Sequence, residues 1–208
     1  MDMVKALAAQ GGVARRRDLA QLGISTHQLT HALAANLIGK PARGVYSLPD
    51  ADRNLLAAKC AGSDLACISA AKRLDLWILK DPVYIHVSVD HGRPLPDEFR
   101  VHRSAIPLTP LDICVQCLRC LPELDALCIV ESAVVKKLVT LGQLRSRLHS
   151  AKDGRIRRVV DLVDPHSQSI METVARYHLR AAELSVQTQV YVSGVGRAGS
   201  FCGRDPRY

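Results

Sequence analysis

Apolar positions in the first fifty residues recur at helical spacing in three short segments. They predict helices over residues 4–8, 16–22 and 26–35, and Gly23 separates the last two. Ser25 is a favourable N-cap for the third helix, because its hydroxyl can accept a hydrogen bond from a free backbone N–H. Three closely spaced amphipathic helices predict a small helical head at the N-terminus.

Two short strands follow this head. Residues 37–40 and 44–48 carry β-branched and aromatic side chains, and the turn "KPARG" joins them. Three helices and a β-hairpin, in this order, make a winged helix-turn-helix over residues 1–49, in which the third helix can enter a major groove. A winged helix that binds only protein remains the alternative.

Basic and polar side chains flank the predicted turn and wing. Three arginines begin the second helix and two cations lie at the wing tip, where phosphates are within reach. Hydroxyl, amide and imidazole groups on the third helix suit base edges, and a glutamine can pair with adenine. The residues expected to contact DNA are Arg15, Arg16, Arg17, Ser25, Thr26, His27, Gln28, Thr30, His31, Lys40 and Arg43.

Residues 50–160 predict a second domain of mixed α+β type. Helices are expected from Asp52 to Ala61 and over "SDLACISAAKRLDLWIL", the latter capped by Ser69 or entered near Asp64. The segment "PVYIHVSVD" alternates as a half-buried strand, and "FRVHRS" is a second strand. Helices over residues 110–121 and 123–137 follow, the latter amphipathic, and "TLGQLRSRL" is a further short helix.

Histidines and cysteines are the residues whose spacing could indicate a metal site. His86, His91 and His102 match no tetrahedral ligand pattern, so polar roles in the core or on the surface are favoured. Cys114, Cys117 and Cys120 have the spacing of iron–sulfur ligands, with Cys128 eight residues on. They lie in a predicted helix, which spreads their thiols over a wide arc, so we expect neither a metal nor a cofactor.

Composition narrows the class of protein. The chain has 208 residues, 48% hydrophobic and 23% charged, with seven cysteines and a net charge of +8. These values are typical of a globular protein, and with no export signal or membrane-length apolar run we expect a cytoplasmic chain with reduced thiols. The positive charge favours a polyanionic partner, nucleic acid before membrane. The basic stretch at residues 145–158 is either a solvated helix face or a second phosphate-binding patch.

The segments described so far resemble a known family. "GVARRRDLAQLGIS" and "RGVYSL" resemble the winged helix of AbiEi-type antitoxins, and "ISAAKRL", "VHRS", "TPLD" and "LRSRL" resemble the domain that follows it in actinobacterial proteins. The C-terminal stretch "SIMETVARYHLRAAELSVQTQVYVSGVGR" resembles the start of a very-short-patch-repair endonuclease domain of the PD-(D/E)xK class. The resemblance implies an α+β protein with an incomplete nuclease-like remnant at residues 161–208.

The nuclease resemblance fails where its metal site is due. Gly194 to Arg197 match the family pattern, but Ala198-Gly199-Ser200 replace the context of the expected aspartate. We expect no second strand after the one near Tyr191 and a mobile tail over 194–208, with Asp205 the only later acid. Glu172 is then a vestigial catalytic residue without partners, the chain looks cut, and no enzyme activity is expected.

Three functions follow from this sequence. The first is a regulator of the antitoxin type that binds double-stranded DNA and represses its own promoter. The resemblance implies a nucleotidyltransferase-like toxin as its protein partner, in a toxin–antitoxin or phage-defence system. The second is a degraded or partner-dependent DNA endonuclease, and the third is a protein-interaction module in phage exclusion. Salt-dependent DNA binding separates the first from the third.

Overall fold

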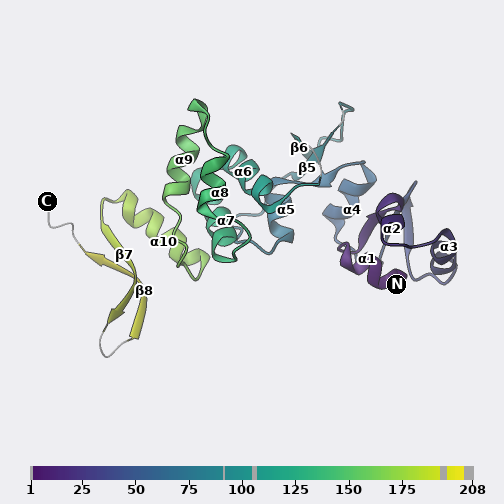
Figure 1. Ribbon diagram of the computed structural model, residues 1–208, viewed down its shortest axis with the longest axis horizontal. Coiled ribbons are helices and arrows are strands. Elements are labelled where there is room, and N and C mark those ends of the chain that lie inside the picture. The colour runs from purple at the N-terminus through teal and green to yellow at the C-terminus, as the bar shows by residue number, and fades with distance from the viewer. Residues whose placement is uncertain (1, 91, 105–106, 193–195, 204–208) are drawn as a thin grey trace. The chain divides into compact units, whose positions relative to one another are not determined.

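The computed structural model describes residues 2–90, 92–104, 107–192 and 196–203. The chain forms two compact units (Figure 1). Unit 1 comprises residues 1–65 and 84–107, and unit 2 comprises residues 66–83 and 108–208. The domain boundaries predicted after residues 49 and 160 both fall inside a unit.

The N-terminal part of unit 1 has the order of elements of a winged helix-turn-helix. Its elements are α1 (Met3–Ala9), β1 (Val13–Arg15), α2 (Arg16–Gln21), α3 (Thr26–Ala34), β2 (Gly39–Ala42) and β3 (Val45–Ser47). The three predicted helices and both wing strands are confirmed within two residues at either end. Strand β1 was not predicted, and it pairs antiparallel with β3 to give the sheet order β1-β3-β2.

A compact apolar core holds the three helices against this sheet. Leu7, Leu19 and Leu29, one from each helix, are at most 2% exposed and share one cluster with Ile24 and Tyr46. The turn between α2 and α3 depends on Gly23, whose φ of 79° lies in the left-handed region. The core therefore fixes α3 relative to the wing.

The same unit continues through a second small sheet. Its elements are α4 (Arg53–Cys60), β4 (Asp64–Leu65), β5 (Ile85–Val89) and β6 (Phe99–Arg103). Strand β4 is antiparallel to β5, and β6 is parallel to β5. Val13, Val45 and Leu55 form one cluster, so α4 packs on the winged helix and completes its core. Neither predicted start of the next helix is right: β4 occupies Asp64, and the helix begins at Cys67, which places Ser69 inside it.

Strand β5 is buried on both faces. Val87 and Val89 are at most 2% exposed, and His86 and Ser88, which alternate with them, are at most 7% exposed. The Ser88 hydroxyl lies 2.8 Å from the Ser104 hydroxyl, which satisfies this buried polar group. The prediction of a half-buried strand is therefore wrong: the polar alternation marks buried side chains with hydrogen-bond partners.

Unit 2 is mainly helical. Its elements are α5 (Cys67–Arg73), α6 (Pro110–Cys120), α7 (Glu123–Val135), α8 (Leu141–Ser146), a 3-10 turn η1 (Ala151–Asp153), α9 (Gly154–Asp161), α10 (Ile170–Ala181), β7 (Ser185–Val192) and β8 (Gly196–Gly203). Helices α6, α9 and α10 all contact α7. Eight consecutive residues of α7, from Ala126 to Ala133, are buried. The predicted amphipathic character of this helix is therefore wrong, because neighbours cover it on more than one face.

The C-terminal segment forms a hairpin. Strand β7 confirms the strand predicted near Tyr191, and β8 pairs with it antiparallel. The expectation that no second strand follows is therefore wrong. Asp205, the acid expected to stand alone, lies outside the described residues.

Candidate nucleic-acid interface

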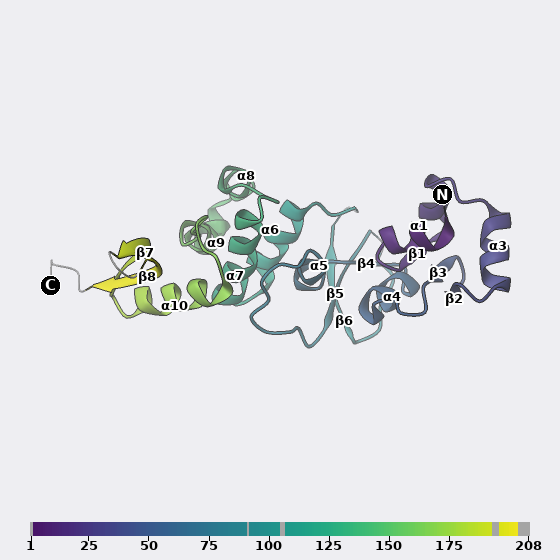
Figure 2. The ribbon, with the colours of Figure 1, turned by 90° about the horizontal axis from the view of Figure 1, so that it is seen from below.

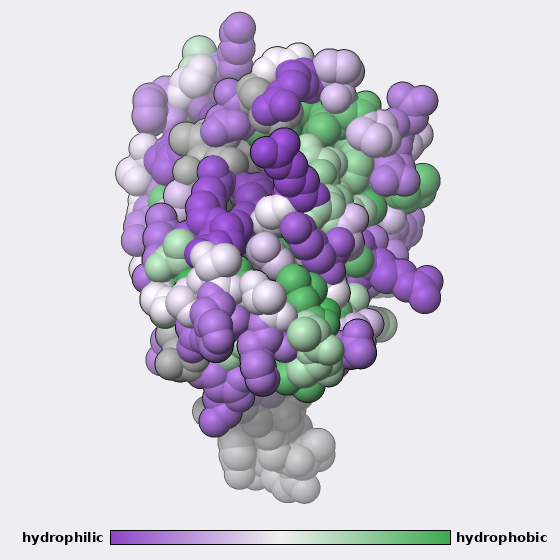
Figure 3. Space-filling model, turned by 90° about the vertical axis from the view of Figure 1, so that its right-hand side faces the viewer, coloured by the Kyte–Doolittle hydropathy of each residue, from purple (hydrophilic) through white to green (hydrophobic). Residues whose placement is uncertain are grey.

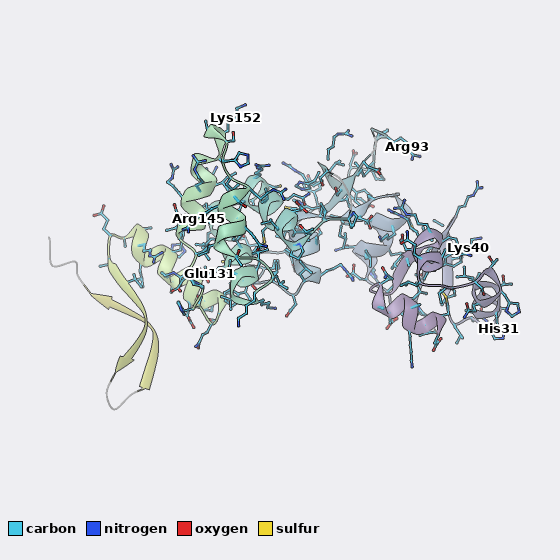
Figure 4. The ribbon with its side chains drawn as sticks, in the orientation of Figure 1. His31, Lys40, Arg93, Glu131, Arg145 and Lys152 are labelled. Carbon is cyan, nitrogen blue, oxygen red and sulfur yellow. The ribbon has the colours of Figure 1, made fainter. Side chains whose placement is uncertain are left out.

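Helix α3 presents a polar face to solvent. Thr26, His27, Thr30 and His31 are exposed, while Leu29 and Ala32 on the opposite face are buried. Figure 2 shows α3 at the outer edge of unit 1, with the wing strands following it. His31 and Lys40 both lie on the outer surface of this unit (Figure 4). The surface seen from this side of the molecule is mostly hydrophilic (Figure 3).

The start of α3 is held by a reciprocal cap. The Ser25 hydroxyl accepts a hydrogen bond from the Gln28 backbone N–H at 3.2 Å, and the Gln28 side-chain oxygen accepts one from the Ser25 N–H at 2.8 Å. Such a capping box satisfies two backbone donors that the helix leaves free. Gln28, predicted to read a base, thus already has a structural role in the free protein.

Arg16 joins the two helices of the motif. Its guanidinium donates to the Ile24 carbonyl at 3.3 Å and to the Thr26 hydroxyl at 3.0 Å. Both acceptors lie at the turn or at the first residue of α3. The side chain predicted to reach a phosphate therefore lies where it can fix the position of α3.

Arg15 points into unit 1. It donates to the Ser63 carbonyl at 2.6 Å and forms an ion pair with Asp64 at 3.3 Å. Lys59 binds the other oxygen of the same carboxylate. This network ties the end of β1 to β4 and α4, and its members Lys59 and Asp64 were missed from the sequence because nothing local indicates a contact 49 residues away.

Arg17, Lys40 and Arg43 are the exposed cations of the predicted set. Arg17 has a 66% exposed side chain, and its Nε lies 3.4 Å from a carboxylate oxygen of its neighbour Asp18. Among the described residues, Lys40 and Arg43 have no ion-pair partner. Gly44, with a φ of 74°, makes the turn that presents Arg43. These three side chains are exposed where a phosphate can reach them.

The basic stretch of unit 2 is largely tied to its own unit. Arg145 pairs with Asp161 at 3.0 Å and Arg147 with Asp112 at 2.9 Å. Arg157 donates to two main-chain carbonyls, those of Leu148 and Ser150. Lys152, Arg155 and Arg158 are the exposed cations that remain. Three of the six cations therefore serve local structure, which favours the solvated helix face among the two interpretations of this stretch.

Glu172 also has a structural position. It lies in the first turn of α10, where its carboxylate accepts from the Gln168 N–H at 3.1 Å and from the Ser169 hydroxyl at 3.4 Å. The Ser169 hydroxyl in turn accepts from the Glu172 N–H. The acid that the sequence suggests as a vestigial catalytic residue thus stabilises the start of its own helix.

Two of the three cysteines of α6, Cys114 and Cys117, are buried thiols, and Cys120 is partly exposed. Burial raises the pKa of Cys114 to about 12. A hydrogen bond with Cys67, together with burial, raises the pKa of Cys117 well above its ordinary value. Thiols with raised pKa values are inert toward oxidants and electrophiles. Of the three predicted histidines, His86 and His102 lie together within unit 1, and His91 is outside the described residues.

Comparison with known proteins agrees with this geometry. Residues 1–49 match the family "Transcriptional regulator, AbiEi antitoxin". The match supports a DNA-binding regulator of the antitoxin type. It covers the AbiEi-like domain, the name used below for residues 1–49, and none of the remaining chain.

Other comparisons add little. No curated protein matches the chain. Among solved structures, the RV2827C protein from Mycobacterium tuberculosis is similar at 16% identity and a TM-score of 0.38, over 84% of this chain and 80% of its own. A TM-score at this level does not establish a shared fold. No described helix combines the length and apolar character that a membrane span needs.

Proposed function

We propose that the protein is a transcriptional regulator of the antitoxin type that binds duplex DNA through α3 and the wing. The main support is that the region matched to a regulator family contains a helix with an exposed polar face and exposed cations near it. In this proposal Thr26, His27, Thr30 and His31 enter the major groove. Arg17, Lys40 and Arg43 bind flanking phosphates.

The remaining residues predicted to contact DNA instead make contacts within the protein that hold this surface in position. Arg15 and Arg16 hold the helix-turn-helix in place, and Ser25 with Gln28 caps α3. For Gln28 to read an adenine edge, its side chain must first leave the Ser25 N–H. The proposed interface is therefore smaller than the set of residues that the sequence suggests.

Salt dependence of DNA binding tests the phosphate contacts. The assay is fluorescence anisotropy with DNA from the region upstream of the gene, between 50 and 200 mM salt. Because each phosphate contact adds about 0.9 to the slope of log Kobs against log salt, the R17A/K40A/R43A variant is expected to lower that slope by about 2.7. The matched control R73A/K80A removes two exposed cations of unit 2 and should leave it unchanged. No binding even at low salt would refute the proposal.

Groove contacts are tested by sequence preference. The H27A/H31A variant is expected to bind upstream and scrambled DNA with similar affinity while keeping most of the wild-type salt slope. Competition between the two DNAs in a gel shift measures the preference. If the variant keeps the full sequence preference, the two histidines of α3 do not read the base sequence.

Regulation and partnership extend the proposal. We infer that the protein represses its own promoter and neutralises a nucleotidyltransferase-like toxin, as the resemblance of the chain to AbiEi-type antitoxins implies. A reporter fused to the upstream region measures repression. Co-expression with the product of the adjacent reading frame measures relief of growth arrest. Reporter activity that does not respond to the protein contradicts autoregulation.

Nuclease activity is not part of this proposal. The Glu172 carboxylate is engaged at the N-terminus of α10, and a catalytic Mg²⁺ needs several oxygen ligands in near-octahedral array. We expect supercoiled plasmid to remain intact with Mg²⁺. Nicking that the E172A variant abolishes would favour the endonuclease alternative. Failure to bind any DNA would instead favour the interaction module.

A further inference from the structure

Two imidazoles meet inside unit 1. His86 lies on β5 and His102 on β6, where their side chains project from neighbouring parallel strands. The His86 Nδ1 and the His102 Nε2 lie 3.1 Å apart, and the ring centroids are 5.3 Å apart at an interplanar angle of 29°. His86 is only 7% exposed. Two ring nitrogens are thus directed at each other in a buried setting.

Two chemical states are compatible with this distance. In the first, one ring N–H donates to the other nitrogen, which needs one particular pair of tautomers. In the second, both nitrogens present lone pairs to one cation. Because Zn–N bonds are about 2.0–2.1 Å, two nitrogens of a tetrahedral zinc ion are about 3.3–3.4 Å apart. The rings need to separate by only a few tenths of an ångström to hold such an ion.

The small sheet would gain stability from such an ion. Strand β4 has only two residues, and the apolar cluster on this sheet centres on Ala58, Val87 and Phe99. Strand β6 joins the sheet along one edge, next to β5. Small cores with few apolar side chains commonly use a structural metal as an additional constraint. A cation bound by His86 and His102 would fasten β6 to β5 across a separation of 16 residues.

We propose that His86 and His102 bind a transition metal ion, with Zn²⁺ the first candidate. Neutral imidazole is the ligand that Zn, Cu and Ni ions share, whereas Mg²⁺ and Ca²⁺ prefer oxygen. The ion has a structural role in unit 1 and takes no part in DNA contacts. The proposal is independent of the regulator function, since it rests on residues outside the AbiEi-like domain.

Metal content and affinity provide the first test. The full-length protein is treated with chelator and then titrated with Zn²⁺ against a chromophoric chelator, and bound zinc is counted by mass spectrometry. Wild type is expected to bind one equivalent, and H102Q is expected to bind at least 10-fold more weakly, as loss of a ligand requires. The matched control is H27Q/H31Q, which removes the exposed pair on α3 and should keep the full equivalent. Equal binding by H102Q and wild type, or no binding by wild type, overturns the proposal.

X-ray absorption identifies the donors directly. The zinc-loaded wild type is expected to show scattering from two imidazole rings, and the spectrum identifies the other donor atoms by type. This measurement needs no variant, so it decides the question even if H102Q does not fold. A first shell without imidazole overturns the proposal.

Thermal unfolding gives a third readout. Zinc in slight molar excess over the protein is expected to raise the wild-type Tm by at least about 4 °C, because an ion bound only by the folded state stabilises that state. The Tm of H102Q should not respond to zinc, and that of H27Q/H31Q should respond like wild type. A zinc-induced rise of equal size in H102Q contradicts the assignment.

Discussion

Individual arginines of the two units have opposite environments. In the AbiEi-like domain, Arg17 and Arg43 lie on the surface, and within the described part of the chain neither forms an ion pair with another element. In unit 2, Arg176 is 1% exposed and forms an ion pair with Glu131, which is fully buried. Figure 4 places Glu131 among the helices of unit 2 and Arg145 on their surface. A surface cation is available to a polyanion, whereas a buried one is committed to the fold.

The buried pair belongs to a closed network. The Glu131 carboxylate on α7 accepts from the Arg176 guanidinium at 2.5 and 2.6 Å, from the Thr173 hydroxyl at 2.5 Å and from the Asp164 N–H at 2.7 Å. The Arg176 guanidinium also donates to the Ser167 hydroxyl at 3.3 Å. The Glu131 carboxylate is thus surrounded by donors, and additional hydrogen bonds of this kind are the condition under which a buried pair is tolerated. This network holds α10 to α7.

Breaking this pair should have the largest effect. R176M leaves the Glu131 carboxylate buried without its cation, and we expect a loss of about 3–5 kcal/mol in the free energy of unfolding. Urea unfolding followed by circular dichroism measures it. The double variant E131L/R176M removes both charges and should recover most of the loss. A single variant within 1 kcal/mol of wild type would show that the pair is solvated.

The Arg15 network should have an intermediate effect. Its side chains are 14% exposed at Arg15, 24% at Asp64 and 15% at Lys59, so solvent screens them only in part. R15M is expected to cost about 1.5–3 kcal/mol, the range for hydrogen bonds to charged groups. Its DNA-binding salt slope should stay close to that of wild type, whereas R17A should lower the slope and leave stability within about 0.5 kcal/mol. If R15M instead lowered the salt slope and left stability unchanged, Arg15 would be a DNA contact.

The elements that sequence predicts best are those with local signals. Ser25 before α3 and Pro110 at the start of α6 fix helix starts within a few residues. The winged helix followed from these signals and from glycine turns, and the structure confirms its elements. Strand β1 escaped prediction because three residues carry no periodicity, and its pairing with β3 is a long-range contact.

The errors arise where a polar residue has a distant or hidden partner. Glu131 interrupts an apolar run in α7, and its partner Arg176 lies 45 residues away. His86 and Ser88 look like a solvent face because alternation cannot distinguish water from buried hydrogen-bond partners. Gln28 suggests base reading and Glu172 suggests catalysis from residue type alone, yet each side chain accepts a hydrogen bond from a backbone N–H at the start of its own helix. The sequence suggests a set of interface residues but does not show which of these side chains already have partners within the protein.

The cap of α3 should have a smaller effect. S25A removes the acceptor for the Gln28 N–H, and substitutions of this kind cost about 1 kcal/mol. Because the lost bond orders the first turn of α3, DNA affinity should fall with little change in salt slope. S169A, which removes the equivalent cap of α10, is the matched control. This variant should lose a similar amount of stability and bind DNA like wild type. Equal loss of DNA affinity in both variants would point to general destabilisation.

The smallest effect is expected at the surface pair of Asp112 and Arg147. Their side chains are 26% and 48% exposed, so R147A should cost at most about 0.5 kcal/mol at pH 7. Burial raises the pKa of Asp112, but hydrogen bonds from Thr109 and the Arg147 guanidinium outweigh it and leave the pKa below 3.8. A lowered carboxyl pKa stabilises the fold above the unfolded value, and this contribution disappears as the pH falls through the folded one. The difference in the free energy of unfolding between wild type and R147A should therefore be present at pH 7 and disappear below pH 3.8. A gap that widens on acidification would contradict this assignment, and NMR titration of Asp112 in both proteins measures the shift directly.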